Sequence, residues 1–395
     1  MRPGGSSQRT PSTQSAPVLT TLGVTPMPVR SAAPPRGSFR LVPLVLALLA
    51  ALLAVAVPAA APAHAAVPDR WGFAYLDNPT PPPGYAPDPS RQWGSWASPA
   101  SNPVKVDQTG AGTYTVHFPL IGGGSGGVAH VTAVNRTGTW CQVQGWGAVG
   151  TGLDVKVACY NPAGAPASSP FTVLFSSSTG TPPPPGGDYG YLYSLPSGAL
   201  LSQYNSAGGA NLSSHGSTGL WKAWLPGLGS SVEVGDVQVT AVDAVQGARC
   251  KVAGWYPSST GQTFLVACFD AANAPYDTAW TLSYSVKRAV HGPAYPPKSF
   301  GYLWYNGAVP AGTNFNSAGG TNTLSVGVPS AVLMPGVAVP SDHAQVTAYG
   351  NGPGWCQLAL PWTRSSGTVK LAPLCFNPGG SPVSAPFLLA YTSAF

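Results

Sequence analysis

The stretch from Cys250 to Cys268, CKVAGWYPSSTGQTFLVAC, decides the fold, because similar stretches run from Cys141 to Cys159 and from Cys356 to Cys375. In each, a cysteine opens a short alternating segment, a turn-rich stretch follows, and a second apolar segment ends in cysteine and an aromatic residue. This pattern predicts a β-hairpin closed by a disulfide. The chain is therefore expected to be a threefold repeat.

Strands with period-two alternation surround each hairpin. Every copy opens with aromatic-Gly-aromatic-x-aromatic, and a strand of the type VQVTA precedes the first cysteine of each copy. An aromatic strand follows the second cysteine after a turn. About seven short strands per copy, separated by turn signals, are typical of a β-sandwich. We expect an all-β protein of three tandem immunoglobulin-like or β-sandwich repeats, each with one disulfide inside it.

Composition sets the domain boundaries and supports the fold class. Gly 49 and Pro 44 with only 8% charged residues disfavour long amphipathic helices, whereas 10% aromatic residues disfavour disorder. Proline-rich stretches predict semi-rigid linkers, so the repeats are expected to be separate modules with small mutual contacts. The expected parts are a polar lead and signal peptide at 1–65, repeat 1 at 66–177, a linker at 178–187, repeat 2 at 188–287, a linker at 288–298, and repeat 3 at 299–395.

Most of the net charge of +6 comes from the residues before position 66. Five arginines precede residue 66 and no acidic residue does, so 18 − 5 = 13 Lys and Arg remain against 12 Asp and Glu. A nearly neutral surface argues against nucleic acid as a partner.

The N-terminal region has the pattern of an export signal. The apolar run Leu44 to Val57 follows Arg40 and precedes Ala63-His64-Ala65, which predicts cleavage between Ala65 and Ala66 and a secreted protein. The alternative is an uncleaved anchor, but the run is shorter than the ~20 residues that span a bilayer, so no stable membrane span is expected after processing. Because the polar lead is long, Met27 is an alternative start to Met1.

Six cysteines in an exported chain, two per repeat, predict three disulfides. The favoured pairs are Cys141–Cys159, Cys250–Cys268 and Cys356–Cys375. Each would stabilise its hairpin by roughly 3 kcal/mol. A metal–thiolate site is the alternative, but the chain has no CxxC and no histidine at matching positions. No metal and no cofactor is expected.

The exported part resembles a group of secreted repeat proteins from high-GC bacteria that have no known activity. The resemblance rests on the GY-x-aromatic opening, the YNSxGG motif, the VQVTA strand and the paired cysteines with Trp255 between them. It implies an extracellular β-rich module and transfers no functional residue.

Residues capable of catalysis do not form a recurring set. The chain has one glutamate, Glu233, and aspartates that do not recur in all three copies, although Asp236, Asp270 and Asp277 could cluster in the second. Ser125 stands in a G-x-S-x-G sequence that lacks the strand and helix of a nucleophile elbow. No catalytic residue is predicted.

Two histidines are stronger candidates for a metal or catalytic site. His117 and His130 lie on strands that could be neighbours, where they could face each other across a ladder and hold a metal or act as a base. A structural or surface role is the alternative that we favour.

Aromatic side chains are the remaining candidates for a binding site. Exposed rings near the turns could stack on sugar faces, although such rings also fill the cores of small β-domains. The candidate ligand-binding residues are Trp93, Trp96, Tyr204, Trp221, Trp224 and Phe315. Trp146 and Trp255, five residues after a cysteine, are instead expected to pack on the disulfide.

These features predict a non-enzymatic, secreted binding or surface-structural protein. Its expected partner is an extracellular polysaccharide or another secreted protein, held by avidity through three weak sites. An inhibitor or accessory domain of an extracellular enzyme is the alternative, and an extracellular enzyme is the third option. The oligomeric state is left open.

Overall fold

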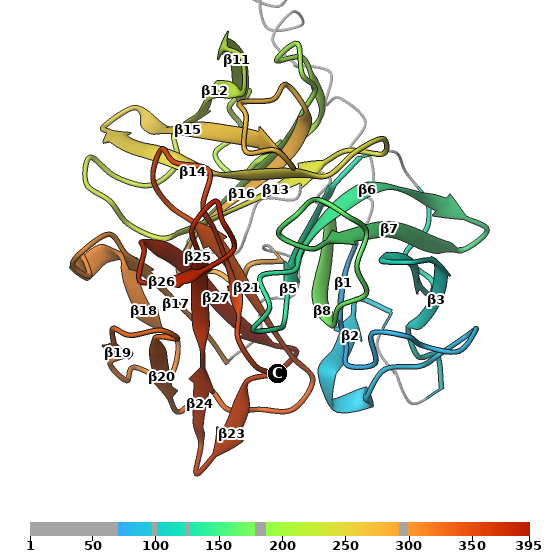
Figure 1. The fold of residues 1–395 in the computed structure, drawn as a ribbon. Coiled ribbons are helices and arrows are strands. Elements are labelled where there is room, and N and C mark those ends of the chain that lie inside the picture. The colour runs from blue at the N-terminus through green and yellow to red at the C-terminus, as the bar shows by residue number, and fades with distance from the viewer. Residues whose placement is uncertain (1–69, 97–100, 124–125, 178–186, 292–298) are drawn as a thin grey trace, which may run out of the picture. The chain divides into compact units, whose positions relative to one another are not determined.

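The computed structural model of the chain describes residues 70–96, 101–123, 126–177, 187–291 and 299–395. The expected signal peptide with its cleavage site at Ala65–Ala66, Ser125, and most of both expected linkers lie outside the described residues. We refer to residues 70–177, 188–287 and 299–395 as the first, second and third segments (Figure 1).

Each segment pairs its opening strand with its last strand in one four-stranded arrangement, which we call its first layer. Long apolar runs make these strands buried along nearly their whole length. The strands of the first layers, in sheet order, are β2(Gln92–Gly94), β1(Arg70–Leu76), β8(Phe171–Ser177) and β5(Val128–Ala133); β10(Leu200–Asn205), β9(Asp188–Ser194), β16(Ala279–Val286) and β13(Asp236–Val242); and β18(Asn314–Asn316), β17(Phe300–Tyr305), β27(Phe387–Ser393) and β21(Asp342–Ala348).

The cysteine hairpins belong to the other layer of each segment. The second layers are β3(Lys105–Gly110), β4(Thr113–Phe118), β7(Gly152–Tyr160) and β6(Trp140–Val149); β11(Leu212–Ser217), β12(Leu220–Pro226), β15(Gly261–Asp270) and β14(Ala248–Ser258); and, split into two sheets, β19(Thr323–Ser325), β20(Ala331–Pro335), β24(Thr368–Leu371) and β23(Thr363–Ser365) with β22(Trp355–Leu358), β25(Pro373–Phe376) and β26(Pro382–Val383). Single 3-10 turns, η1(Pro89–Arg91) and η2(Ala311–Thr313), precede β2 and β18.

Alternation in the sequence explains how the layers pack. In β4 the buried residues are Tyr114, Val116 and Phe118, and the residues between them are half-buried. The apolar face of each second layer meets the first layer of the same segment and forms a large hydrophobic core there. Each of these cores also includes one or two buried side chains of a neighbouring segment. The prediction of an all-β fold is confirmed.

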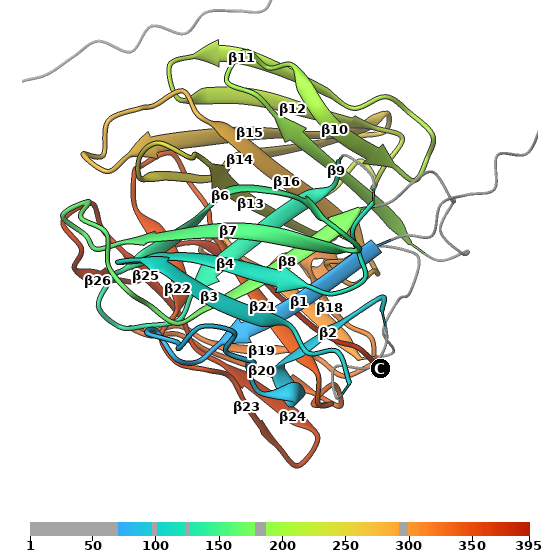
Figure 2. The same ribbon diagram turned by 90° about the vertical axis from the view of Figure 1, so that its right-hand side faces the viewer.

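The segments are joined by backbone pairing as well as by side chains. Strand β6 of the first segment pairs in parallel with β13 of the second at Val143 and Val242, which joins the two segments in one eight-stranded sheet. Figure 2 shows these strands side by side, from β10 to β3. The described residues all belong to one compact unit. The expectation of separate modules with small mutual contacts is therefore wrong.

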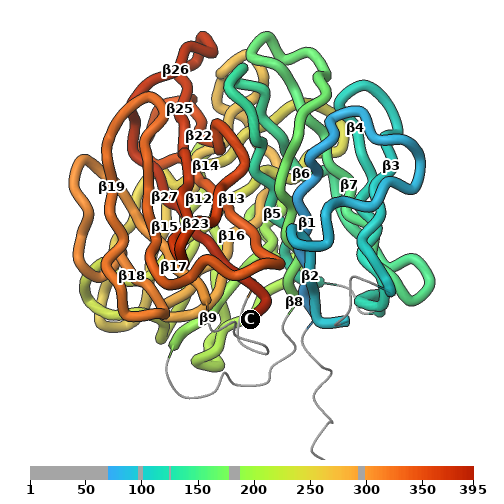
Figure 3. Tube along the Cα trace, turned by 90° about the horizontal axis from the view of Figure 1, so that it is seen from below, coloured from blue at the N-terminus to red at the C-terminus, as the bar shows by residue number. Residues whose placement is uncertain are grey.

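A layer of buried polar side chains lies where β5, β13 and β21 meet. These strands contact one another and carry the sequence HVTA or QVTA. Figure 3 shows two of them, β5 and β13, near the middle of the view. The hydroxyl of each threonine forms a hydrogen bond with a histidine or glutamine side chain of a neighbouring segment. The contacts are His130 Nδ1 with Thr240 Oγ1 at 3.1 Å, Thr347 Oγ1 donating to Gln238 Oε1 at 2.8 Å, and Thr132 Oγ1 donating to Gln345 Oε1 at 2.5 Å.

The residue after each first cysteine makes a second closed series of contacts. Each of these side chains donates to backbone carbonyls in a loop of the following segment, and the third reaches the first. Gln142 binds Asp243 and Gln246, Lys251 binds Gly352 and Gly354, and Gln357 binds Asn135. Because both series close on themselves, the three segments support one another around a common centre.

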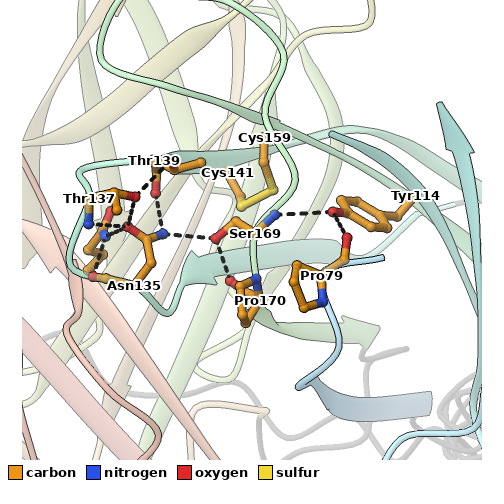
Figure 4. The surroundings of a disulfide bond; sticks show 10 residues. Pro79, Tyr114, Asn135, Thr137, Thr139, Cys141, Cys159, Ser169 and Pro170 are labelled. Atoms are coloured by element: carbon orange, nitrogen blue, oxygen red, sulfur yellow. Dashed lines mark hydrogen bonds between the residues drawn. A yellow bond between two sulfur atoms is a disulfide. The ribbon is translucent and has the colours of Figure 1, made fainter. Parts of the chain in front are cut away.

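The disulfides link Cys141–Cys159, Cys250–Cys268 and Cys356–Cys375, each between directly paired residues of its hairpin. Figure 4 shows that a hydrogen-bond network surrounds the first of them: Tyr114 donates to the Pro79 carbonyl and accepts from the Ser169 amide. Three disulfides indicate an oxidising compartment. Among the described residues, no helix has the length and hydrophobicity needed to span a bilayer.

Candidate functional site

A tryptophan near the end of each cysteine hairpin packs on an aromatic residue of the opening strand of the next segment. We call each such pair an aromatic joint. The ring centroids are 4.7 Å apart in the first joint, Trp146–Tyr193, 5.2 Å apart in the second, Trp255–Trp304, and 5.5 Å apart in the third, Trp362–Tyr75. The joints therefore connect the first segment to the second, the second to the third, and the third to the first.

Bulges in the hairpins position two of these tryptophans. The register of β6 with β7 shifts between Val143 and Gly145, and the register of β14 with β15 shifts between Val252 and Gly254. A bulge turns the following side chain to a different face. Gly145 has a φ of 152°, a backbone conformation open to glycine. The bulge thus places the indole of Trp146 against Tyr193 of the neighbouring segment.

Two of the joints are closed. Trp255 and Trp304 are 4% and 3% exposed, and the ring of Tyr349 lies 4.9 Å from that of Trp304. In the third joint Trp362 is 1% exposed. Its ring lies 4.6 Å from the guanidinium carbon of Arg91, which also donates to the Trp362 carbonyl.

The first joint is open. Trp146 and Tyr193 are both half-buried, and the residue in the position of Tyr349, after the Thr-Ala of the central strand, is the smaller Val242. Two hollows, of about 570 and 610 Å³, share the hairpin residues from Gly145 to Ala148. A Cβ atom added at Gly145 or Gly147 would have no neighbour within 4 Å. This joint has room for a ligand beside an aromatic face.

The two hollows differ in their lining. The larger is mainly apolar, with Leu153, Tyr193 and Leu201, and Leu201 is 57% exposed. The smaller contains the polar residues Gln144, Asp154 and Lys156. Trp146 itself is held in place by a 3.0 Å hydrogen bond from its Nε1 to the carbonyl of Gly126. The site therefore consists of the Trp146 indole in a fixed orientation, apolar residues in the larger hollow, and one positively and one negatively charged side chain in the smaller hollow.

Asp154 also connects this surface to a histidine. His117 Nδ1 lies 2.7 Å from Asp154 Oδ1, and its Nε2 lies 2.9 Å from Asp107 Oδ2. Partial burial lowers the pKa of His117, but the hydrogen bonds to the two aspartates outweigh it, so the net pKa is raised. His117 therefore takes up a proton more readily than a free histidine, and its two ring nitrogens are both occupied.

The structure separates His117 from His130. His117 lies on β4 of the second layer, whereas His130 lies on β5 of the first layer and contacts Thr240. The two imidazoles therefore do not face each other across a ladder. Among the described residues, no group of three His, Cys, Asp or Glu side chains could hold a metal ion.

The three aspartates considered in the second segment have different partners. Asp236 accepts from Gln238, Asp270 accepts from the amide of Ala274, and Asp277 contacts His215. They do not form one site.

The candidate aromatic residues are spread over several places. Trp221 is 0% exposed and Tyr204 is 6% exposed, so both rings lie in cores. The other candidates, Trp93, Trp96, Trp224 and Phe315, are half-buried. Trp93 packs on Phe395 and Phe315 stacks on Tyr302, so these rings pack within the protein.

Sequence reasoning did not select Trp146 or Tyr193 for binding. The recurrence of tryptophan after the cysteine indicates a common role, and that role is the aromatic joint. The sequence signal that could have distinguished the first joint from the second is the residue after the Thr-Ala of the central strand, which is Val242 at the first joint and Tyr349 at the second.

No protein family, curated protein or solved structure matches this chain.

Proposed function

We propose that this chain is a secreted, non-enzymatic binding protein whose ligand site is the first aromatic joint. Under this proposal the three segments are copies of one β-sandwich module, and the first joint is the one that has been left open for a ligand. The observation that carries the proposal is the contrast in exposure: Trp146 is half-buried, whereas Trp255 and Trp362 are 4% and 1% exposed.

The proposed ligand is a segment of a neutral polysaccharide. An indole face beside an apolar surface suits the C–H face of a sugar ring, and neighbouring polar groups can bind its hydroxyls. The donors and acceptors at hand are Gln144, Lys156 and Asp154 in one hollow and Ser202 in the other. Since one cation and one anion line the hollow, a neutral ligand is favoured over a charged one.

The test is binding of the purified full chain to a panel of neutral oligosaccharides, measured by titration calorimetry and by retention on the insoluble polymers. Trp146→Ala removes the indole, and a central aromatic anchor of this type is worth about 2 kcal/mol or more. We expect at least a tenfold loss of affinity. Leu201→Lys places a charge at the rim of the larger hollow without disturbing the core, because Leu201 is 57% exposed, and it should weaken binding as well.

The matched control is Tyr256→Ala. Tyr256 is a 57% exposed aromatic residue that lines neither hollow, so its removal should leave binding unchanged. Urea unfolding of each variant verifies the fold. Binding that survives both Trp146→Ala and Leu201→Lys in folded proteins would refute the site. Failure of every neutral polymer to bind the wild-type chain would refute the ligand class.

A further inference from the structure

A further cavity lies at the centre of the three segments, separate from the two hollows at the first aromatic joint. It has a volume of about 50 Å³ and is lined by residues of the three hairpins and the ends of β5, β13 and β21. The residues that directly precede the first cysteine of each hairpin all line it. They are Trp140, Arg249 and Trp355.

Arg249 lies between the two tryptophans. Its guanidinium carbon is 4.2 Å from the ring centroid of Trp140 and 4.3 Å from that of Trp355, and the residue is 7% exposed. Its Nη2 donates to Asn273 Oδ1 at 2.5 Å and lies 3.4 Å from the carbonyl oxygen of Asp270. Its Nε and Nη1 are buried without an acceptor in the described part of the chain. A buried guanidinium normally uses these donors.

Lys251 brings a second positive charge to the same cavity. It is 7% exposed, and its Nζ donates to the carbonyls of Gly352 at 2.9 Å and Gly354 at 3.1 Å. Both partners are neutral. Among the described residues no carboxylate forms an ion pair with Arg249 or Lys251. Burial lowers the pKa of Arg249 to about 10 and that of Lys251 to about 8, with repulsion from Arg249 adding to the latter effect, so both are mainly protonated at pH 7.

Further donors surround the cavity. The indole Nε1 atoms of Trp140 and Trp355 are buried and have no acceptor among the described residues. Gln357 contributes the one lining side-chain acceptor, Oε1, that is likewise buried without a partner in the described part. The site thus holds two cations without an ion-pair partner among the described residues, although the Asp270 carboxylate acts on Arg249 from a greater distance, and four donor nitrogens without acceptors in that part of the chain. Burying such groups without an anion is costly.

We propose that this central cavity binds one small inorganic anion of the size of chloride. A cavity of ~10–15 Å³ is enough for one water, so about 50 Å³ accommodates one such ion and its immediate surroundings but excludes sugars and organic acids of several carbons. The anion would accept hydrogen bonds from the guanidinium and indole N–H groups and neutralise part of the charge of Lys251.

The comparison of the three segments supports a single ion per chain. The positions of Arg249 and Lys251 are occupied by tryptophan and glutamine in the other two hairpins. Both cations therefore come from the second segment, and both line the cavity to which all three hairpins contribute.

The test is the thermal unfolding of the full chain in sodium chloride and in sodium gluconate of the same ionic strength, since gluconate is too large for the cavity. We expect chloride to raise the unfolding midpoint of the wild type by about 5 °C, with saturation. Bromide soaked into crystals should give an anomalous peak between Arg249 and Lys251.

The first variant is Lys251→Gln, because glutamine at positions 142 and 357 already donates to the neighbouring carbonyls and the variant should fold. It should need at least tenfold more chloride for the same rise. Arg249→Met should abolish the rise. The control Lys222→Gln removes an exposed lysine of β12 and should behave as the wild type. An equal chloride effect in Lys251→Gln and Lys222→Gln, or a rise with sulfate but not with chloride, would overturn the proposal.

Discussion

Substitution of His130 by glutamine should make the protein more resistant to acid. His130 is completely buried on β5, and its Nδ1 lies 3.1 Å from Thr240 Oγ1. The corresponding residues of the other central strands are Gln238 and Gln345, which each accept a hydrogen bond from a threonine hydroxyl. Glutamine at position 130 can accept the hydroxyl of Thr240 in the same way, so stability at neutral pH should change by less than about 1 kcal/mol.

The magnitude of the acid effect follows from the pKa. Burial lowers the pKa of His130 to about 3, whereas histidine in an unfolded chain titrates near 6.5. Between these values the unfolded state binds more protons than the native state, so the free energy of unfolding falls as the pH falls. At pH 4.5, which is ~2 pH units below the pKa of the unfolded state, the loss from this one residue is on the order of 3 kcal/mol.

The assay is urea unfolding of the wild type and of His130→Gln at pH 7.5 and pH 4.5. The wild type should lose on the order of 3 kcal/mol more than the variant between the two conditions. His343 remains in both proteins, and its pKa is also lowered by burial and by the neighbouring histidines, so the variant keeps some acid sensitivity. The reverse substitution, Gln345→His, should steepen the loss. Equal losses in the wild type and in His130→Gln would refute this reasoning.

Two further predictions concern buried carboxylates. Burial raises the pKa of Asp236 to about 7, so the native state binds more protons than the unfolded state between pH 3.8 and 7. Asp236→Asn should therefore raise the free energy of unfolding by up to about 4 kcal/mol at pH 8 and leave it unchanged at pH 3.5. Urea titration at the two pH values measures both effects. Asp342 is 0% exposed and forms ion pairs at 3.0 Å with Arg91 of the first segment and with Arg364 of its own segment. Asp342→Asn should lower the urea midpoint by an amount equivalent to about 3 kcal/mol. An unchanged midpoint would contradict the idea that the Arg91–Asp342 ion pair stabilises the contact between the two segments.

Short-range patterns in the sequence predicted the strands that bury one face. The cysteine hairpins, the aromatic opening strands and the central strands all appear in the structure. The strands that the sequence did not indicate are the polar edge strands, such as Leu212–Ser217, in which most residues are exposed. An edge strand needs backbone partners but buries little, so its sequence carries no alternation.

The sequence pattern did not predict that the segments associate, and the reason is related. Alternation in a strand such as Val237-Gln238-Val239-Thr240 predicts a polar face in water. In the structure both faces of β13 are buried, because the polar face meets the polar faces of β5 and β21. A sequence pattern records which side chains are polar but not whether their partners are water or another segment. The feature of the sequence that indicated burial of these polar faces was the low content of charged residues.

The differences between the three segments bear on the number of ligands. From the sequence, a weak site was expected in each of three repeats, and therefore binding through three equivalent contacts. The two candidate sites instead arise where one segment differs from the others: the first joint lacks the cover that Tyr349 and Arg91 give elsewhere, and the central cavity has Arg249 where the other segments have tryptophan. Two closed joints stabilise the assembly, which allows the third to remain open. Titration calorimetry should therefore give one saccharide and one anion per chain, and three saccharides per chain would place the site in a feature that all the segments share.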